Sequence, residues 1–195
     1  MTNKTYRQLI LAPLLADWQI ADSSGWLAKL VQCGLIGRRV DHAEPTYFRI
    51  GEQFLQYFSF MGCSPAVEFE PASDGDIDWH NFIFIHIPET LPEVKWLADE
   101  QTAKPACPLC HKRTRDWSDA LQMEQLLIQC PNCSESAPVC DWNWHDSGGC
   151  ARQFICIVNV YPREAIPSDH FLKLLADVCG IEWRFFYVNA PLLPS

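Results

Sequence analysis

Hydrophobic and polar residues along this chain follow the period of strands in some segments and of helices in others. Residues 81–89 (NFIFIHIPE) are hydrophobic at consecutive positions, with two phenylalanines on one face of the pleat and three isoleucines on the other. Because hydrophobic residues occupy both faces, this run predicts a central strand that is buried on both sides.

The C-terminal pattern is the clearest in the chain. Residues 152–162 (RQFICIVNVYP) and 181–189 (IEWRFFYVN) have the pattern of strands, and between them lies a helix-like segment with Ser168 as its N-cap and Gly180 as its stop. The order strand, helix, strand predicts a βαβ unit, in which a right-handed crossover joins two parallel strands.

The N-terminal third has a similar order. A strand-like segment at residues 7–13 is followed by a predicted helix that is capped by Ser23 or Ser24 and ends near Gly37. We therefore expect an α+β fold, with a mixed sheet and βαβ-type units at both ends of the chain. Residues 1–102 and 151–195 would form one domain, and residues 103–150 would be an insert.

The predicted insert contains two C-x-x-C pairs, which are Cys107 with Cys110 and Cys130 with Cys133. Zinc favours four tetrahedral thiolate or imidazole ligands, and two such turns at the ends of a hairpin can meet at one ion. A redox dithiol needs only one pair that opens a helix, whereas both pairs here lie in turns that contain proline. Structural zinc is the favoured interpretation, and redox dithiols and simple buried thiols are the alternatives.

At these residues the sequence resembles the zinc-ribbon class, whose rubredoxin-like knuckles carry paired CPxC turns. The resemblance covers about residues 103–150 and implies one structural Zn²⁺ per chain, held by the four cysteines. Such knuckles often have glycine directly after the second cysteine, where this chain has His111 and Ser134. The rest of the chain resembles bacterial proteins of unassigned function, which implies nothing about its role.

Length and charge narrow the class of protein. A chain of 195 residues suits one large domain or two small ones, and its net charge is −9. Nine acids and one base fall between Pro65 and Glu100, and such an acidic block favours a basic protein partner over nucleic acid or an anionic membrane. The N-terminus has no cleavage pattern of a signal peptide, so we expect a cytoplasmic protein with reduced thiols and no membrane segment.

Three classes of function remain open at this point. The first is a non-enzymatic protein-interaction module stiffened by zinc, and the third is an enzyme of unrecognised type, which is less favoured. The second is a nucleic-acid binder, which would use residues of the predicted insert: Lys104, His111, Lys112, Arg113, Arg115 and Trp117. Residues 103–150 carry six acids against four bases, which disfavours this second class.

Other candidate residues give weaker signals. Cys140, His145 and Cys150 have irregular spacing and no obvious fourth ligand, so a second metal site there is an open question. His80 and His86 are about 20 Å apart along one extended strand, too far to share an ion. The remaining cysteines are expected to be buried residues of the core: Cys33, Cys63, Cys156 and Cys179.

Overall fold

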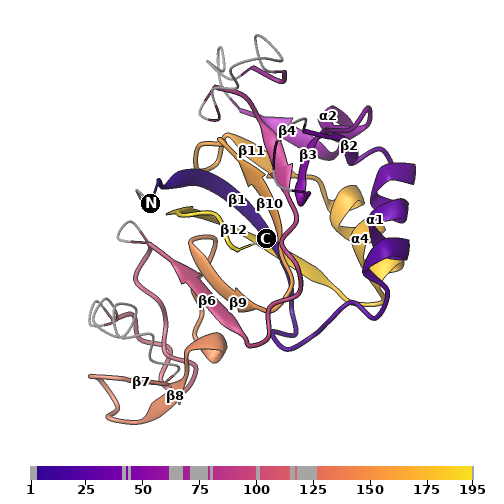
Figure 1. Cartoon of the computed structure of the whole chain (residues 1–195). Helices are drawn as coiled ribbons and strands as arrows, with labels where there is room; N and C mark the ends of the chain where they lie inside the picture. The colour runs from indigo at the N-terminus through magenta and orange to yellow at the C-terminus, as the bar shows by residue number, and fades with distance from the viewer. Residues whose placement is uncertain are drawn as a thin grey trace.

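The structure is a computed structural model, and it describes residues 4–40, 43, 45–61, 68–70, 79, 81–99, 102–114, 117 and 127–194. A six-stranded sheet forms the centre, the helices α1 and α4 lie to one side of it, and a small unit with strands β7 and β8 projects from the opposite side (Figure 1).

The central sheet is antiparallel throughout the described part of the chain. Its order is β12-β1-β10-β5-β3-β2, and each of its neighbouring pairs is antiparallel. The α+β class is therefore confirmed, with more strand than helix, whereas the predicted mixed sheet is wrong. The strands are β1 (Tyr6–Pro13), β2 (Ile36–Arg39), β3 (Tyr47–Ile50), β5 (Phe84–His86), β10 (Ile155–Val158) and β12 (Trp183–Ala190).

The two strands joined by the crossover helix α4 are not neighbours in the sheet, which is why the sheet is not mixed. Strand β10, helix α4 (Asp169–Cys179) and strand β12 follow one another along the chain, but both strands pair with β1 and not with each other. Since both are antiparallel to β1, β10 and β12 are parallel to one another and separated by it. A crossover helix fixes the parallel direction of two strands but does not prevent a third strand from lying between them.

The ends of the helices follow capping chemistry. Ser168 caps α4 by accepting a hydrogen bond from the Phe171 N–H (3.2 Å), and Gly180 ends the helix with φ of 71°, as predicted. The predicted cap of α1 (Ser23–Gln32) is wrong by one residue, because Asp22 accepts from the Gly25 N–H (3.0 Å) and Ser23 is already helical. A short helix, α2 (Phe54–Tyr57), follows β3.

The two faces of the sheet contribute to two separate hydrophobic cores. Leu9, Leu11, Ile155 and Ile157 point to the first core, which also contains buried residues of α1 and α4. Alternate residues of the same strands point to the second core, and these include Ile10, Ala12, Cys156 and Val158. Because both faces are covered, residues 82–87 are all at most 5% exposed, which confirms the predicted central strand.

Three two-stranded sheets complete the described part of the fold. They are β4 (Phe58–Phe60) with β11 (Ala165–Pro167), β6 (Lys95–Ala98) with β9 (Gly148–Ala151), and β7 (Leu127–Gln129) with β8 (Ser136–Pro138). A 3-10 helix, η1 (Val139–Asp141), follows β8. The segment between β6 and β9, residues 99–147, carries both C-x-x-C pairs, and we call it the metal unit.

The β6–β9 pair forms the wall between the metal unit and the sheet. Trp96 and Cys150 are opposite one another in this pair and belong to a third hydrophobic core, which they share with residues of the metal unit. Leu97 and Ala151 point the other way, into the second core of the sheet. Because successive side chains of β6 and β9 point to opposite faces, each strand contributes to both cores, and the strand pair lies between them.

His86 is a buried titratable residue of the central sheet. It has no exposed surface, and neither of its ring nitrogens has a hydrogen-bond partner in the described residues. Cys156 and Tyr47 lie opposite it on the two neighbouring strands, and the Tyr47 ring stands edge-on to the imidazole at 4.9 Å. Burial lowers the pKa of His86 from its ordinary value of 6.5 to about 4, so the ring is neutral in the folded protein.

This burial predicts a pH dependence of stability. Between pH 6.5 and about 4 the unfolded chain binds a proton at His86 and the folded protein does not. The contribution of His86 to the free energy of unfolding should therefore be fully present above pH 6.5, and it should fall by about 3 kcal/mol as the pH drops to 4. Urea unfolding of the wild type and of His86→Leu across this range measures the effect. Any release of metal in acid affects both proteins, so only the difference between the two curves reports on His86, and parallel curves would refute the prediction.

Candidate metal centre

The four cysteines of the two C-x-x-C pairs meet at one point. Their sulfur atoms all lie within 4.8 Å of one another, with 3.9 Å between Cys107 and Cys133 and 3.7 Å between Cys110 and Cys130. Four sulfurs placed tetrahedrally around a zinc ion, at about 2.3 Å from it, lie about 3.8 Å apart. The cluster is thus close to the size that one metal ion requires.

The two knuckles have the same backbone design. In the first, the Cys107 N–H donates to the Lys112 carbonyl (3.0 Å) and the His111 N–H donates to the Cys107 carbonyl (2.9 Å). The second repeats both bonds at the same spacing, from Cys130 to Glu135 (2.8 Å) and from Ser134 to Cys130 (2.8 Å). Each pair of sulfurs is therefore held by a closed loop of backbone hydrogen bonds before any metal contributes.

Backbone N–H groups also point at the sulfur atoms. The Leu109 N–H donates to the Cys107 sulfur (3.4 Å). In the second knuckle, burial disfavours the thiolate of Cys130, but the N–H groups of Asn132 and Cys133 and the thiols of Cys110 and Cys133 outweigh it. Together they lower the pKa of Cys130 to about 6. Because metal ligands must be thiolates, this donor set fits a divalent cation that prefers sulfur.

The residues that follow the second cysteine of each knuckle are left-handed. His111 has φ of 59° and Ser134 has φ of 64°. This conformation costs a residue with a side chain about 1–2 kcal/mol, and glycine adopts it without that cost. The departure from the zinc-ribbon pattern at these two positions therefore leaves the backbone shape unchanged and adds local strain.

Replacing His111 with glycine should tighten metal binding. Glycine removes the left-handed strain from the folded knuckle, but it also gives the unfolded chain more conformational freedom, which offsets part of that gain. We therefore expect the metal-bound form to be favoured by about 0.5–1 kcal/mol. Competition for zinc with a chromophoric chelator measures the change. Ser136→Gly is the control, because Ser136 lies in strand β8 and glycine there should only destabilise. Equal effects of the two substitutions would contradict the prediction.

Tryptophan side chains build the core of the metal unit. The Trp144 ring lies 4.8 Å from that of Trp96 and 5.6 Å from that of Trp117, and Trp142 is buried in the same cluster. Trp142 and Trp144 are both buried in this core, although the segment that carries them is not a strand. Trp117 is only 5% exposed, so its ring is not available to stack on a nucleic-acid base.

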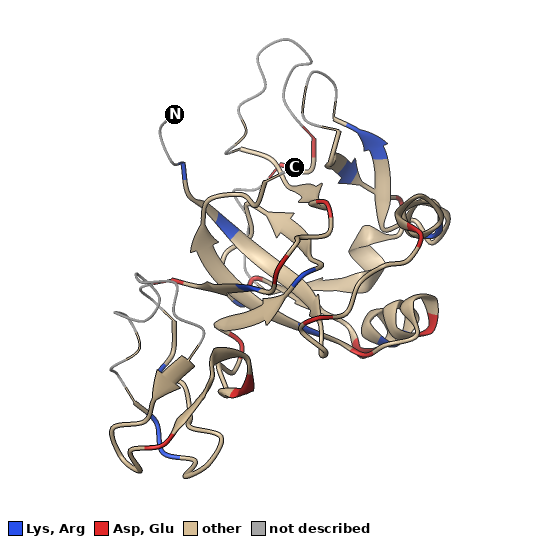
Figure 2. Cartoon of the chain, turned by 60° about the horizontal axis from the view of Figure 1, so that its bottom comes forward, with Lys and Arg blue, Asp and Glu red and all other residues tan. Residues whose placement is uncertain are grey.

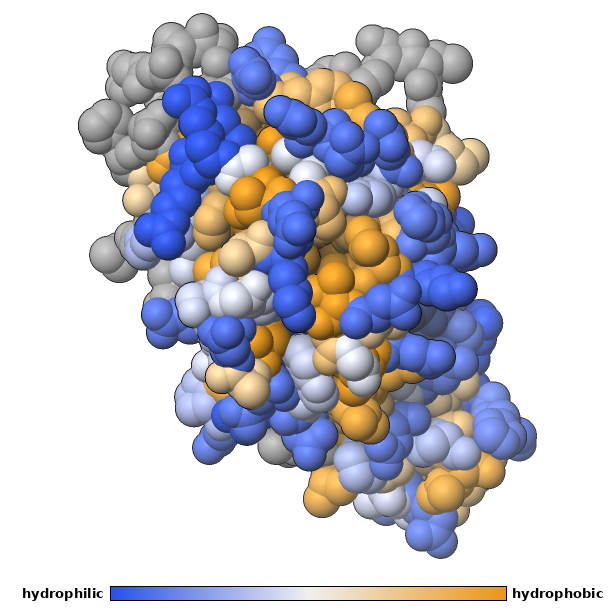
Figure 3. All heavy atoms as spheres, turned by 90° about the vertical axis from the view of Figure 1, so that its right-hand side faces the viewer, coloured by the Kyte–Doolittle hydropathy of each residue, from blue (hydrophilic) through white to orange (hydrophobic). Residues whose placement is uncertain are grey.

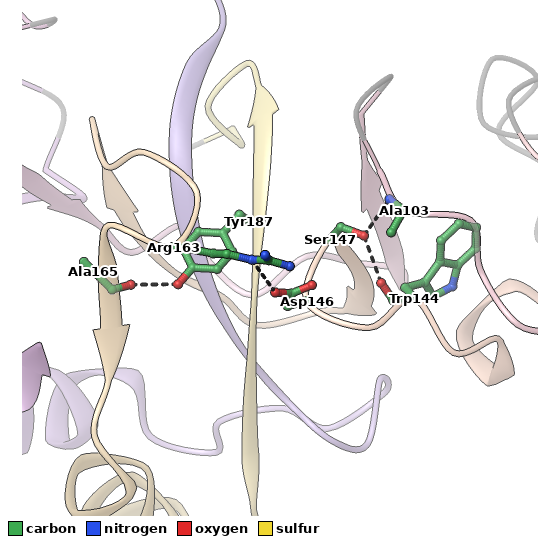
Figure 4. Close-up of polar contacts among 7 residues, drawn as sticks. All are labelled: Ala103, Trp144, Asp146, Ser147, Arg163, Ala165 and Tyr187. Atoms are coloured by element: carbon green, nitrogen blue, oxygen red, sulfur yellow. Dashed lines mark hydrogen bonds and ion pairs between the residues drawn. The ribbon is translucent and has the colours of Figure 1, made fainter. Parts of the chain in front are cut away.

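A tight turn closes the base of the metal unit (Figure 4). The Ser147 hydroxyl donates to the Trp144 carbonyl (3.0 Å) and accepts from the Ala103 N–H (2.8 Å). The residue that follows Trp144 in this turn, His145, is left-handed with φ of 54°. The two ends of the unit are therefore tied together by one serine.

The same turn contacts the central sheet. The Tyr187 N–H of β12 donates to the Asp146 carbonyl (2.9 Å), and the Tyr187 hydroxyl donates to the Ala165 carbonyl (2.8 Å). Arg163 lies 3.5 Å from the Asp146 carboxylate, but both side chains are exposed (Figure 4), so this ion pair contributes little. Together with the β6–β9 wall, the Tyr187–Asp146 hydrogen bond and one from the Asn189 N–H to the Asp99 carboxylate join the metal unit to the central sheet.

The second metal site that the sequence left as an open question does not form in the described residues. Only the four cysteines of the knuckles form a group of three or more metal-binding side chains there, and His145 is exposed. Cys140 and Cys150 do lie together, without His145. Arg184 of β12 lies beside them, and the sequence carries no signal for it, because packing of β9 on β12 brings it there.

The other candidate residues either pack in or against a hydrophobic core or lie outside the described residues. Cys156 is fully buried, which confirms the expectation for this residue, whereas Cys33 and Cys179 are only partly buried and pack against the first core. Cys63, His80 and Arg115 lie outside the described residues, as do Asp74, Asp76 and Asp78 of the acidic segment.

Two cavities lie beside α1, on a face where hydrophobic side chains gather among charged ones (Figure 3). The first, of about 400 Å³, is bordered by Trp26 and Phe48 with Arg39 and Glu89. The second, of about 200 Å³, contains Cys179. None of the four clustered cysteines lines either cavity, so the cavities and the metal centre are separate features.

Comparison with protein-family models, with curated proteins and with solved structures finds no match to this chain. Among the described residues, no helix has the length and hydrophobicity needed to cross a membrane. The candidate function therefore follows from the geometry of the chain itself.

Proposed function

We propose that the four cysteines hold one structural Zn²⁺ and that the protein is a non-enzymatic protein-interaction module. Cys107, Cys110, Cys130 and Cys133 would supply all four tetrahedral ligands. A catalytic zinc keeps one position open for water or substrate, whereas four thiolates fill the sphere. The observation that carries the zinc assignment is the spacing of the sulfurs, which is close to the edge of a tetrahedron of zinc–sulfur bonds.

Exposed leucines on the metal unit support an interaction role. Leu109 stands between the two cysteines of the first knuckle and is 59% exposed, and Leu127 of β7 is 60% exposed. Leu109 lies in a turn whose two cysteines would bind the metal, so the way its side chain is presented to a partner depends on metal binding. Exposed hydrophobic residues on a rigid support are features of protein-binding surfaces.

The charge distribution favours a protein partner over nucleic acid. Acidic and basic residues both occur on the metal unit, at the lower left of Figure 2. The ligand thiolates and Zn²⁺ together would add two negative charges, and the acidic block of residues 65–100 favours a basic partner. Nucleic-acid binders usually carry the opposite balance.

Site-specific photo-crosslinking in cells tests the interaction. A benzophenone amino acid at Leu109 should form a crosslinked adduct, and the adduct should disappear when Cys107 is replaced with serine. The same probe at Leu55, which is 56% exposed on α2, is the matched control and should give no such adduct. Equal adducts at both positions would contradict the proposal, as would a mobility shift with tRNA or duplex DNA at low salt.

A further inference from the structure

A pair of cysteines outside the metal cluster lies at the base of the metal unit. Cys140 belongs to η1 and Cys150 to strand β9, and these two elements pack against one another. Both cysteines are free, both pack in or against the third hydrophobic core, and each thiol shifts the pKa of the other. The pair is ten residues apart in sequence, and only the fold brings it together.

The two thiols differ in their access to solvent. Cys150 has no exposed surface, because it is opposite Trp96 in the β6–β9 wall and faces the core of the metal unit. Cys140 is only partly buried. A small reagent in solution can therefore reach Cys140, and Cys150 is accessible only to the sulfur beside it.

Arg184 places a positive charge next to this pair. Its Nη2 donates to the Cys150 carbonyl (3.4 Å), and its Nε is buried without a hydrogen-bond partner in the described part of the chain. The carboxylate of Asp141 also faces the pair and opposes the effect of the guanidinium. A guanidinium that lacks a full set of acceptors stabilises a nearby thiolate.

These surroundings separate the roles of the two sulfurs. The hydrogen bond from Cys150 lowers the pKa of Cys140, burial opposes it, and Arg184 lowers it further. The hydrogen bond to Cys140 and burial both raise the pKa of Cys150. Cys140 is thus the more acidic sulfur of the pair and the one that ionises first. A low-pKa, accessible cysteine beside a second cysteine is the arrangement of redox-sensitive sites.

We propose that Cys140 and Cys150 form a peroxide-reactive dithiol that closes to a disulfide. The Cys140 thiolate attacks one oxygen of hydrogen peroxide, the S–O bond forms as the O–O bond breaks, and hydroxide leaves, giving a sulfenic acid. The Cys150 sulfur then attacks the Cys140 sulfur, the S–O bond breaks, and hydroxide leaves and takes up the Cys150 proton as water. The hydroxide released in the first step takes up the proton that Cys140 gave to solvent when it ionised, so the two thiols lose two electrons in total and the peroxide is reduced to two molecules of water.

Two other cysteines outside the metal cluster are poorer targets for the same oxidant. Burial raises the pKa of both Cys156 and Cys179, so each is a neutral thiol that reacts slowly. The four cysteines of the cluster are a separate set, and the proposal for Cys140 and Cys150 does not depend on which metal they bind. Oxidation should therefore begin at Cys140.

The test uses the full chain as purified with its metal. The protein is treated with hydrogen peroxide, the remaining thiols are blocked with N-ethylmaleimide under denaturing conditions, and a non-reducing digest is mapped by mass spectrometry. The expected result is loss of the label at Cys140 and Cys150 together, a peptide pair joined by a disulfide, and no loss of metal. Cys156 should keep its label.

Two variants separate the steps. Cys150→Ser should accumulate a sulfenic acid at Cys140 that dimedone traps, and Cys140→Ser should leave Cys150 unoxidised. Full labelling of both residues in the treated wild type would overturn the proposal, and this holds even if a variant fails to fold. Oxidation of the clustered cysteines with metal release before any Cys140–Cys150 bridge forms would overturn it as well.

Discussion

Replacing Cys130 with serine is expected to remove the metal and unfold the metal unit, while the six-stranded sheet stays folded. Structural zinc contributes about 10–16 kcal/mol in isolated zinc-finger peptides, more than a small core can supply by itself. Among the described residues the third core has seven buried side chains besides the cysteines and is smaller than either core of the sheet, and those two cores are built from strands and helices outside the unit. The predicted division into residues 1–102 with 151–195 and an insert of 103–150 is tested in the same experiment.

Hydrogen exchange with and without the substitution locates the limit of unfolding. Protection should be lost in residues 103–114 and 127–147, and retained in residues 82–87 and 171–178. Leu97 and Ala151 belong to the second core of the sheet, so the β6–β9 wall should also stay protected. Cys33→Ser is the control, because it changes a cysteine at the end of α1 and should leave the metal bound. Simultaneous loss of protection in the sheet and in the metal unit would show that the unit is integral to the core.

Replacing Trp144 with alanine should destabilise the metal unit by about 3–5 kcal/mol. The Trp144 ring is 1% exposed and packs between Trp96 and Trp117, and its indole N–H donates to the Val139 carbonyl (2.7 Å). The substitution leaves a cavity and an unpaired buried carbonyl, and both effects act on the core that supports the knuckles. Zinc should therefore bind more weakly.

Trp79→Ala is the matched control for this prediction. Trp79 packs on Phe82 and Phe84 on the sheet side of the molecule, away from the third core. Its loss should lower the free energy of unfolding of the sheet and leave zinc affinity unchanged. Chelator competition measures the affinity of both variants, and unchanged affinity in Trp144→Ala would refute the account of the tryptophan core.

Local chemistry made part of the fold predictable. The continuous hydrophobic run of residues 81–89 and the cap and stop of α4 at Ser168 and Gly180 depend on neighbours in sequence, and both predictions are confirmed. The strand order depends on pairings between distant segments. The position of β1 between β10 and β12 joins residues more than 140 positions apart, and no periodicity in either segment records that partner.

The candidate site likewise has one part that the sequence predicts and another part that depends on the fold. The C-x-x-C spacing predicts each knuckle, because two residues between cysteines bring both sulfurs to one side of a turn. The covering of the cluster by Trp96, Trp117 and Trp144 follows from the fold of the whole unit. Base stacking by Trp117 was one expectation from the sequence, and the burial of its ring does not allow it. The Cys140–Cys150 pair has no spacing pattern and depends on the packing of η1 on β9.

The identity and coordination of the bound metal test the central claim most directly. Elemental analysis with X-ray absorption spectroscopy at the zinc edge, on protein purified without added metal, is the decisive measurement. The account predicts one zinc ion per chain with four sulfur neighbours at about 2.3 Å. Iron in place of zinc, or a coordination shell that includes nitrogen or oxygen, would contradict it.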